Sequence, residues 1–399
     1  MLNRRQILQT IGLGTAAAGI PGIGFANTDG DARFVLIILR GAVDGLAMVA
    51  PYGDGKYRKV RGELAIPPPG KDGGLLKLDG MFGLHPSLRS TYELYKQGQV
   101  LPIHAIASPY RERSHFDGQD VLENGVTRAG EKRDGWLNRA IAPISDVAGR
   151  ESAIALSQNT PLVLRGDNSV TSWAPSRLPG ADDDTLRRLA SLYANDEFFS
   201  SRLEQALASQ EIASDMPAMN ERTRRNDSAQ SKAMAQAAGR FLRAPDGPRI
   251  AVLEAGGWDT HANQGAGTGA LANKLAALDA GIAALRKELG PVWSETVVAI
   301  VTEFGRTARV NGTRGTDHGT ATAAILLGGA VNGGRVMADW PGLSTSDLYQ
   351  GRDLAPTTDL RSLFKGVLGE HLLLPESYIE REVFPDSRTA IPMHGIIRA

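Results

Sequence analysis

Short, continuous apolar runs recur along the chain, and segments whose apolar residues are spaced three and four apart separate them. The runs are rich in Val, Ile, Leu and Ala, as in FVLIILR (34–40) and RIAVLEA (249–255). Such runs are typical of strands that are covered on both faces of a sheet. The predicted strands occupy 34–40, 99–107, 152–157, 161–165, 249–255, 296–304 and 321–329.

Helical periodicity fills the intervals between these runs. It is clearest at 85–98 and at 271–290, where a Gly-Pro pair marks the end of the helix. Strands that alternate with helices predict an α/β fold, in which helices sandwich a mostly parallel central sheet. The glycine-rich stretch within 51–95 predicts a hairpin and loop, in which we expect His85 to be structural.

The segment from about 182 to 243 differs in composition from the rest. It is rich in charge and alanine, with long helical periodicity and almost no β-branched runs. We interpret it as a helical insertion or cap on a single domain that spans 27–399. The alternative is that these are plain helices in the outer layer of the sandwich.

Polar residues gather where the predicted strands end. Ligands of open α/β sheets bind beyond the carboxyl ends of the strands, so these positions are candidates for chemistry. The candidates are Asp44, Arg113, Ser114, His115, Asp259, His261, Glu303, Arg306, Asp317 and His318. Taken singly, each aspartate is explained as a helix cap and each histidine as a hydrogen-bonded structural residue. Several carboxylates together instead need a cation, because burying unpaired charges is costly.

Asp259 and His261 are the strongest candidates for metal ligands. In an extended segment alternate side chains share a face, so these two point the same way, and Gly256 and Gly257 before them let the backbone turn sharply. His318 is a candidate third ligand, which would leave a coordination position open for water or substrate, as in catalytic zinc sites. The pattern therefore predicts a divalent metal site.

Composition narrows the ligands and partners of such a site. The chain has 399 residues, of which 44 are basic and 44 acidic, so it lacks the basic field that attracts nucleic acid. We therefore expect no nucleic acid partner. The chain has no cysteine, so a transition metal must be held by His, Asp or Glu.

The N-terminus predicts export. Arg4 and Arg5 precede a weakly apolar, glycine-rich stretch, and residues 1–26 resemble a twin-arginine signal peptide. The alternative is a basic, amphipathic helix. A signal of this kind implies the twin-arginine export machinery as a partner and a periplasmic or secreted location. No later segment is apolar for long enough to span a bilayer, so we expect no stable membrane span.

The motifs RGAVDGL, SHFDGQD, GGWDTH, TEFGRT and GTDHG occur in this order, with FGLHP and DGWLNR between them. Because it contains these motifs in this order, the chain resembles the DUF1501 family of exported proteins, which is distantly similar to the alkaline phosphatase and sulfatase superfamily. The resemblance implies an alkaline phosphatase-like fold, one or two divalent metals at the strand ends, and an alkoxide nucleophile. The metal would be Zn, Mg, Mn or Ca.

The resemblance also implies roles for single residues. Asp44 matches the first metal-binding aspartate, and Glu303 stands where related enzymes have Asp followed by His. Because Phe304 replaces that histidine, a second site would have only oxygen ligands and would suit Mg²⁺, Mn²⁺ or Ca²⁺ better than Zn²⁺. The residues implied for one complete metal site are Asp259, His261 and His318, with Asp317 beside them.

Ser114 is the candidate nucleophile, with His115 beside it. Arg113 and Arg306 are candidates for neutralising the oxygens of the transferred group. The stretch from Ser108 to Arg111 resembles a sulfatase signature but lacks one residue of its spacing, so formylglycine is not expected.

These features together predict an exported, metal-dependent hydrolase of phosphate or sulfate esters that acts on a small-molecule or glycan ester. One alternative is a non-catalytic binding or assembly protein that retains the fold and one metal. A second is a metal-dependent transferase or mutase on the same scaffold.

Overall fold

The computed structural model describes residues 31–144, 152–175, 183–212, 227–245 and 247–398. The signal peptide predicted for 1–26 lies outside the described residues. No helix in the described ranges has both the length and the apolar character needed to cross a bilayer.

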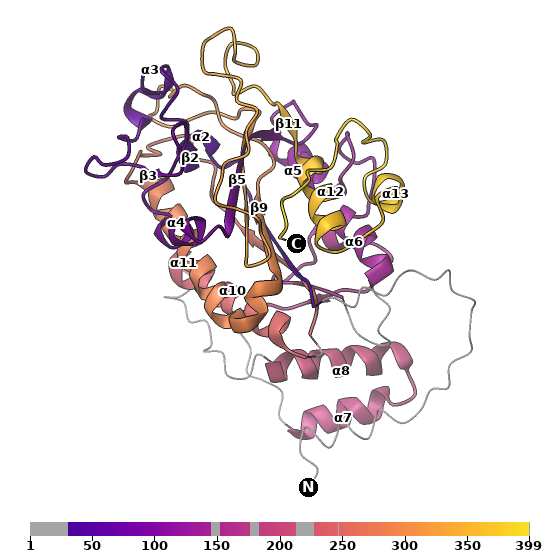
Figure 1. The fold of residues 1–399 in the computed structure, drawn as a ribbon. Coiled ribbons are helices and arrows are strands. Elements are labelled where there is room, and N and C mark those ends of the chain that lie inside the picture. Colours follow the sequence, from indigo (N-terminus) through magenta and orange to yellow (C-terminus); the bar gives the residue numbers. More distant parts are fainter. Residues whose placement is uncertain (1–30, 145–151, 176–182, 213–226, 246, 399) are drawn as a thin grey trace.

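An eight-stranded sheet forms the centre of the structure (Figure 1). Across the sheet the strands are β11 (Thr358–Asp359), β5 (Val100–Ala107), β10 (Thr322–Leu327), β9 (Thr296–Val301), β1 (Arg33–Leu39), β8 (Ile250–Ala255), β6 (Ala153–Ala155) and β7 (Thr171–Ser172). Only β10 of these strands is antiparallel to its neighbours. The prediction of a mostly parallel sheet is confirmed.

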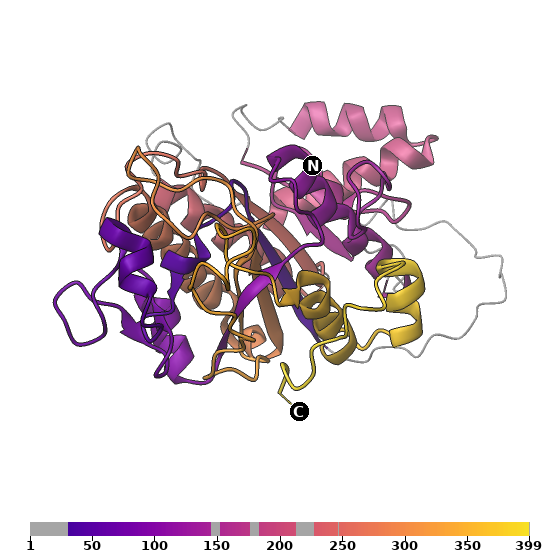
Figure 2. The ribbon, with the colours of Figure 1, turned by 90° about the horizontal axis from the view of Figure 1, so that it is seen from above.

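Helices cover both faces of this sheet (Figures 1 and 2). Alternate residues of β1 point to opposite sides, so that Val35 and Ile37 enter one apolar core and Phe34 and Leu36 enter the other. The first core is closed by α4 (Arg89–Lys96), α10 (Asp227–Arg243) and α11 (Ala270–Leu289). The second is closed by α5 (His115–Asn124), α6 (Trp136–Ile141), α12 (Leu360–Glu370) and the short α13 (Glu376–Tyr378). This is the predicted α/β sandwich.

Two of the predicted elements differ in the structure. The run at 161–165 is not a strand but the 3-10 turn η3 (Leu162–Leu164), in which the Leu164 N–H donates to the Pro161 carbonyl and the Val163 N–H to Glu123. The helix predicted at 85–98 is confined to α4, because Asp279 of α11 accepts the first backbone N–H groups of that helix.

A small second sheet precedes α4. It contains β2 (Val49–Ala50), β4 (Gly83–Leu84) and β3 (Leu76–Lys77), and the antiparallel pair of β3 and β4 confirms the predicted hairpin. Short helices lie near it, α2 (Gly45–Met48) and α3 (Tyr57–Arg61). The remaining short turns are η1 (Gly62–Leu64), η2 (Ala142–Ile144), η4 (Gly290–Glu295) and η5 (Ile379–Val383).

The segment at about 182–243 contains α7 (Asp183–Tyr193), α8 (Glu197–Ile212) and α10. Figure 1 shows α7 and α8 side by side at the lower end of the molecule, whereas α10 packs along α11. The pair α7 and α8 projects, and α10 belongs to the outer layer.

One edge of the sheet collects the polar loops. Strands β1, β5, β8 and β9 run in the same direction, so all four end at this edge. Because β10 is antiparallel, its first residue lies at the same edge, and the loop before it arrives there too. The direction of β10 thus brings His318 to the loops that follow the other strands.

Candidate metal centre

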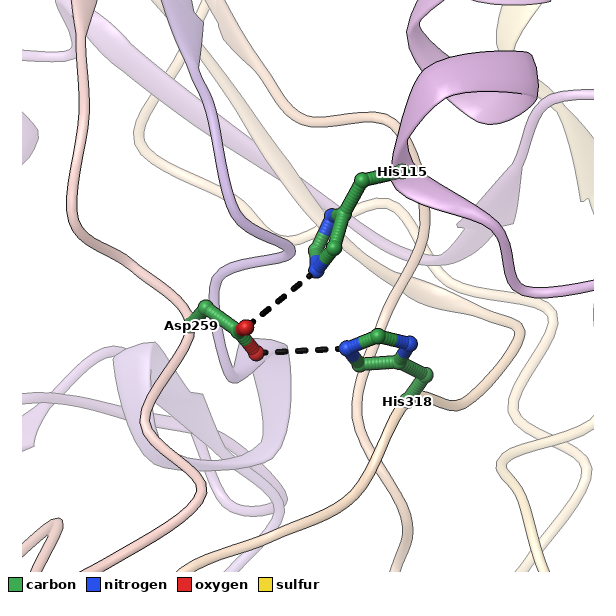
Figure 3. Close-up of side chains that lie close together, drawn as sticks. All are labelled: His115, Asp259 and His318. Carbon is green, nitrogen blue, oxygen red and sulfur yellow. Dashed lines mark hydrogen bonds and ion pairs between the residues drawn. The ribbon is translucent and has the colours of Figure 1, made fainter.

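Three side chains from distant segments converge at this edge. His115 begins α5, Asp259 follows β8 and His318 precedes β10, and their ligand atoms all lie within 4.8 Å of one another (Figure 3). The His115 Nε2 atom is 3.5 Å from Asp259 Oδ2, and the His318 Nε2 atom is 3.3 Å from Asp259 Oδ1. Two imidazoles and a carboxylate are a ligand set that suits zinc and similar ions.

His261 adds a third imidazole to this group. Its Nε2 atom lies 3.0 Å from Asp259 Oδ1 and 3.0 Å from the Nε2 atom of His318. Its Nδ1 atom is 3.3 Å from Asp317 Oδ1. The predicted association of Asp259, His261 and His318 is therefore present in the structure, and Asp317 lies behind His261 rather than among the ligand atoms.

The partners of the other two imidazoles determine where their protons lie. His115 Nδ1 is 2.8 Å from Glu303 Oε1, and His318 Nδ1 is 2.9 Å from the Arg113 carbonyl oxygen. A carboxylate and a carbonyl only accept, so each Nδ1 donates, and in a neutral ring the Nε2 lone pair faces the cluster. Histidine ligands of metals usually have this arrangement, in which the Nδ1–H donates to an acceptor and the Nε2 atom is free to bind the metal.

The Nε2 atom of His115 provides a test of whether a metal fits. It is buried and has no hydrogen-bond partner among the described residues. A buried polar atom without a partner is costly in a folded protein. A cation bound between His115 and Asp259 would remove this cost, so the donor set fits a metal.

The titration properties of the cluster are set by its immediate neighbours. The hydrogen bond that Glu303 accepts from His115 raises the pKa of His115, whereas burial lowers the pKa of His318 and favours its neutral form. Burial would raise the pKa of Asp259, but the hydrogen bond and charge of Arg306 outweigh it and lower that pKa. Asp259 is therefore ionised and available as a ligand.

Arg306 holds Asp259 in place. It is buried, its Nη1 atom donates to Asp259 Oδ1 at 2.5 Å, and its Nε atom donates to Thr316 Oγ1 at 3.1 Å. Thr316 in turn donates to Gln264 Oε1 at 2.8 Å. With these contacts Arg306 orients the Asp259 carboxylate, and its guanidinium is already engaged by protein groups.

A close approach of two backbones brings the loop of Asp259 to the end of β1. Gly41 has a φ of +117°, and a Cβ atom there would lie 2.7 Å from the backbone nitrogen of Asp259. Only glycine fits both the backbone angle and the space. The Gly41 N–H donates to Glu303 Oε1 at 2.8 Å, so the same residue also holds the carboxylate behind His115.

The structure does not bring Asp44 into this cluster. Its carboxylate is buried, accepts the Ala47 N–H as the N-cap of α2, pairs with Arg61 and accepts from Gln264 Nε2 at 2.7 Å. Glu303 has separate partners, which are His115, Gly41, Gln119 and Thr302. Because both carboxylates are already satisfied by protein groups, the second, all-oxygen site expected from Asp44 and Glu303 is not assembled.

Ser114 and Arg113 lie beside the cluster in different roles. Ser114 is the N-cap of α5, next to His115, and its N–H donates to the Tyr110 hydroxyl oxygen at 3.0 Å. The guanidinium of Arg113 pairs with the buried Asp353, with Nη2 2.8 Å from Oδ2. The backbone of Arg113 has a φ of 64°, an uncommon angle that accompanies the contact of its carbonyl with His318.

Phe304 occupies the position at which the resemblance implies a histidine. Its ring stacks on His115 with centroids 5.0 Å apart and lies 5.3 Å from the ring of His318.

The sequence indicated His115 as a neighbour of the candidate nucleophile Ser114, but it did not place His115 among the ligand atoms. A signal was available, because a histidine that begins a helix after a parallel strand faces the same sheet edge as Asp259.

Solved structures with similar architecture include a protein in the alkaline phosphatase superfamily from Vibrio parahaemolyticus. It is 10% identical, with a TM-score of 0.38, and the match covers 86% of this chain and 72% of that one. The phosphonate monoester hydrolase of Agrobacterium radiobacter is 12% identical, with a TM-score of 0.33 and coverage of 77% and 70%. The C-terminal periplasmic domain of EcEptC from Escherichia coli, in complex with Zn, is 10% identical, with a TM-score of 0.34 and coverage of 76% and 74%.

No curated protein matches the sequence. The model of the DUF1501 family, described as a protein of unknown function, matches residues 31–382, and the chain therefore belongs to this family, as its motifs predict.

Proposed function

We propose that this protein binds one divalent transition-metal ion through His115, Asp259, His261 and His318 and hydrolyses phosphate or sulfate esters with it. The observation that carries the proposal is the convergence of imidazole Nε2 atoms on one carboxylate, with each Nδ1 atom close to an acceptor. Nitrogen and carboxylate ligands of this kind favour zinc over magnesium or calcium. The proposal is thus for one ion rather than two.

The site is open enough for a substrate. The exposed fractions of the side chains are 38% for Asp259, 43% for His261 and 26% for His318. A divalent ion bound there would polarise an ester oxygen and lower the pKa of a water molecule. Arg306 keeps Asp259 ionised and oriented for that purpose, and Glu303 orients the His115 ring by accepting its Nδ1–H.

The surroundings of the cluster favour an anionic substrate. Arg352 donates to the His318 carbonyl at 2.7 Å and Arg314 donates to Asn263 at 2.8 Å, two residues beyond His261. Arg314 is exposed and, within the described part of the chain, has no carboxylate within ion-pair distance. Its positive charge, held against the segment that follows His261, supports binding of a phosphate or sulfate group.

Ser114 is the proposed nucleophile, because it is a hydroxyl group adjacent to a ligand. It also stands at the N-terminus of α5, where backbone N–H groups favour an anion. Attack by the serine oxygen would break the ester bond and leave the phosphoryl or sulfuryl group on Ser114, with the alcohol as leaving group, and water would then release the acid. Direct attack by water is the other route, and substitution of Ser114 separates the two.

The test combines metal content with turnover in the purified full chain. We expect about one zinc ion per chain and hydrolysis of aryl phosphate, phosphodiester or aryl sulfate esters. His318→Ala should lose the ion and reduce turnover by about a hundredfold or more, whereas His394→Ala, at an exposed position, should change neither. Ser114→Ala should retain the ion and lose turnover. A chain with bound zinc that hydrolyses none of these esters would contradict the proposal and favour a binding or assembly protein.

A further inference from the structure

A cavity of about 140 Å³ lies between α10, α11 and the end of β8, outside the metal centre. Its interior is lined mainly by aliphatic side chains. They include Ile37, Met234, Leu253, Leu278, Ile282 and Leu285. Small residues help to make the space, because Ala277 and Gly281 of α11 and Ala235 of α10 all line it.

The volume of the cavity limits what it can hold. An apolar cavity of about 150 Å³ binds a benzene molecule, so this one holds a ring or chain of about six carbon atoms. An apolar lining is not hydrated well, and a hydrocarbon gains contacts that water does not offer there. The interior therefore selects an apolar group.

The charged groups that line this cavity are already paired. Lys274 Nζ is 2.9 Å from Asp227 Oδ2 and donates to the Gly256 carbonyl at 3.2 Å. Glu254 pairs with Arg40. A charged ligand would have to compete with one of these ion pairs, whereas a hydroxyl or amide can hydrogen-bond to them without breaking either.

We propose that this cavity binds a small, uncharged amphiphile, with an alkyl or aryl group of about six carbons inside and a hydroxyl or amide group at the mouth. Trp258 forms part of the wall, and its indole N–H donates to the Ala255 carbonyl at 2.9 Å. The next residue is the ligand Asp259. The bound molecule thus contacts the segment that leads into the metal centre, but its binding needs no metal.

Calorimetric titration of the full chain with 1-hexanol, hexanoate and hexylamine tests both halves of this inference. We expect saturable binding of 1-hexanol and affinities for the two charged probes that are weaker by about tenfold or more. Tighter binding of hexanoate or hexylamine would overturn the assignment of an uncharged head group. Absence of saturable 1-hexanol binding would overturn the site itself.

Substitutions locate the binding. Ala277→Leu fills the cavity and should weaken 1-hexanol binding by about tenfold or more, whereas Ala276→Leu adds the same atoms at the neighbouring exposed position and should leave it unchanged. If Ala277→Leu does not fold, Ala235→Leu fills the space from α10. Binding that survives in a folded, filled variant would contradict the proposal. These titrations are made without added metal, so their failure leaves the proposed hydrolase untouched.

Discussion

At the scale of single residues, two carboxylates that look alike in the sequence have different roles. Asp44 and Asp259 both follow a parallel strand, and both lie in a loop that contains glycine. Asp259 faces imidazoles, whereas Asp44 caps α2 and pairs with the buried Arg61. From the sequence pattern alone, a helix N-cap explains either aspartate equally well. Only the position of Arg61, which is set by tertiary packing, separates the two.

Asp44→Asn distinguishes a structural Asp44 from a metal ligand. The substitution leaves the Arg61 guanidinium buried without its countercharge, so we expect the free energy of unfolding to fall by about 3 to 5 kcal/mol. Denaturant titration measures that change. Metal content of the folded variant should equal that of the parent chain, and the exposed Asp72→Asn should alter neither quantity. Loss of metal from folded Asp44→Asn would restore Asp44 as a ligand.

At the scale of elements, the sequence predicted the strands and the polar residues that follow them. It did not predict which of the loops contact one another. Continuous apolar runs predicted β1, β5, β8, β9 and β10 because each is buried on both faces. The run at 161–165 has the same composition but turns at Pro161, so apolar content alone did not identify a strand there. The convergence of His115 and Glu303 depends on a contact across 188 residues, which no local pattern contains.

Strand β5 contains a buried histidine that makes stability depend on pH. His104 Nε2 is 2.8 Å from the Val49 carbonyl oxygen, and its ring stacks on Phe82. Burial lowers its pKa to about 4, from 6.5 in the unfolded chain. The unfolded state therefore binds this proton more readily than the folded state does, and stability falls as the pH falls from about 6.5 toward 4.

We expect this one group to remove up to about 3 kcal/mol of unfolding free energy across that range. Unfolding titrations at several pH values measure the slope. His104→Gln retains a donor for the Val49 carbonyl but does not titrate, so its slope should be shallower than that of the parent chain. An equal slope in the two proteins would show that His104 stays neutral, or titrates alike, in both states.

At the scale of the whole molecule, the candidate metal centre joins the loops after β5 and β8 to the loop before β10. His115, Asp259 and His318 belong to different loops at the same sheet edge, so a bound ion would tie these loops together. An ion that binds only the folded chain stabilises it by mass action.

Removal of the ion should therefore lower the thermal midpoint. At a free zinc concentration about a hundredfold above Kd, the ion adds about 2.7 kcal/mol to stability, and a chelator should remove that increment. Calorimetric scans with and without chelator measure the difference. In His261→Ala the difference should shrink, because one ligand is lost. Identical midpoints with and without chelator in the parent chain would argue against a metal bound to the folded state.

The antiparallel direction of β10 has a consequence for folding. His318 reaches Asp259 across 59 residues and the Arg113 carbonyl across 205, so these contacts close large loops late rather than early. A nascent chain that has made β1 and β5 holds His115 but neither of its companions. The ion therefore has no complete site until β10 pairs with β9 and β5, and we expect metal uptake to follow completion of the sheet rather than to guide it.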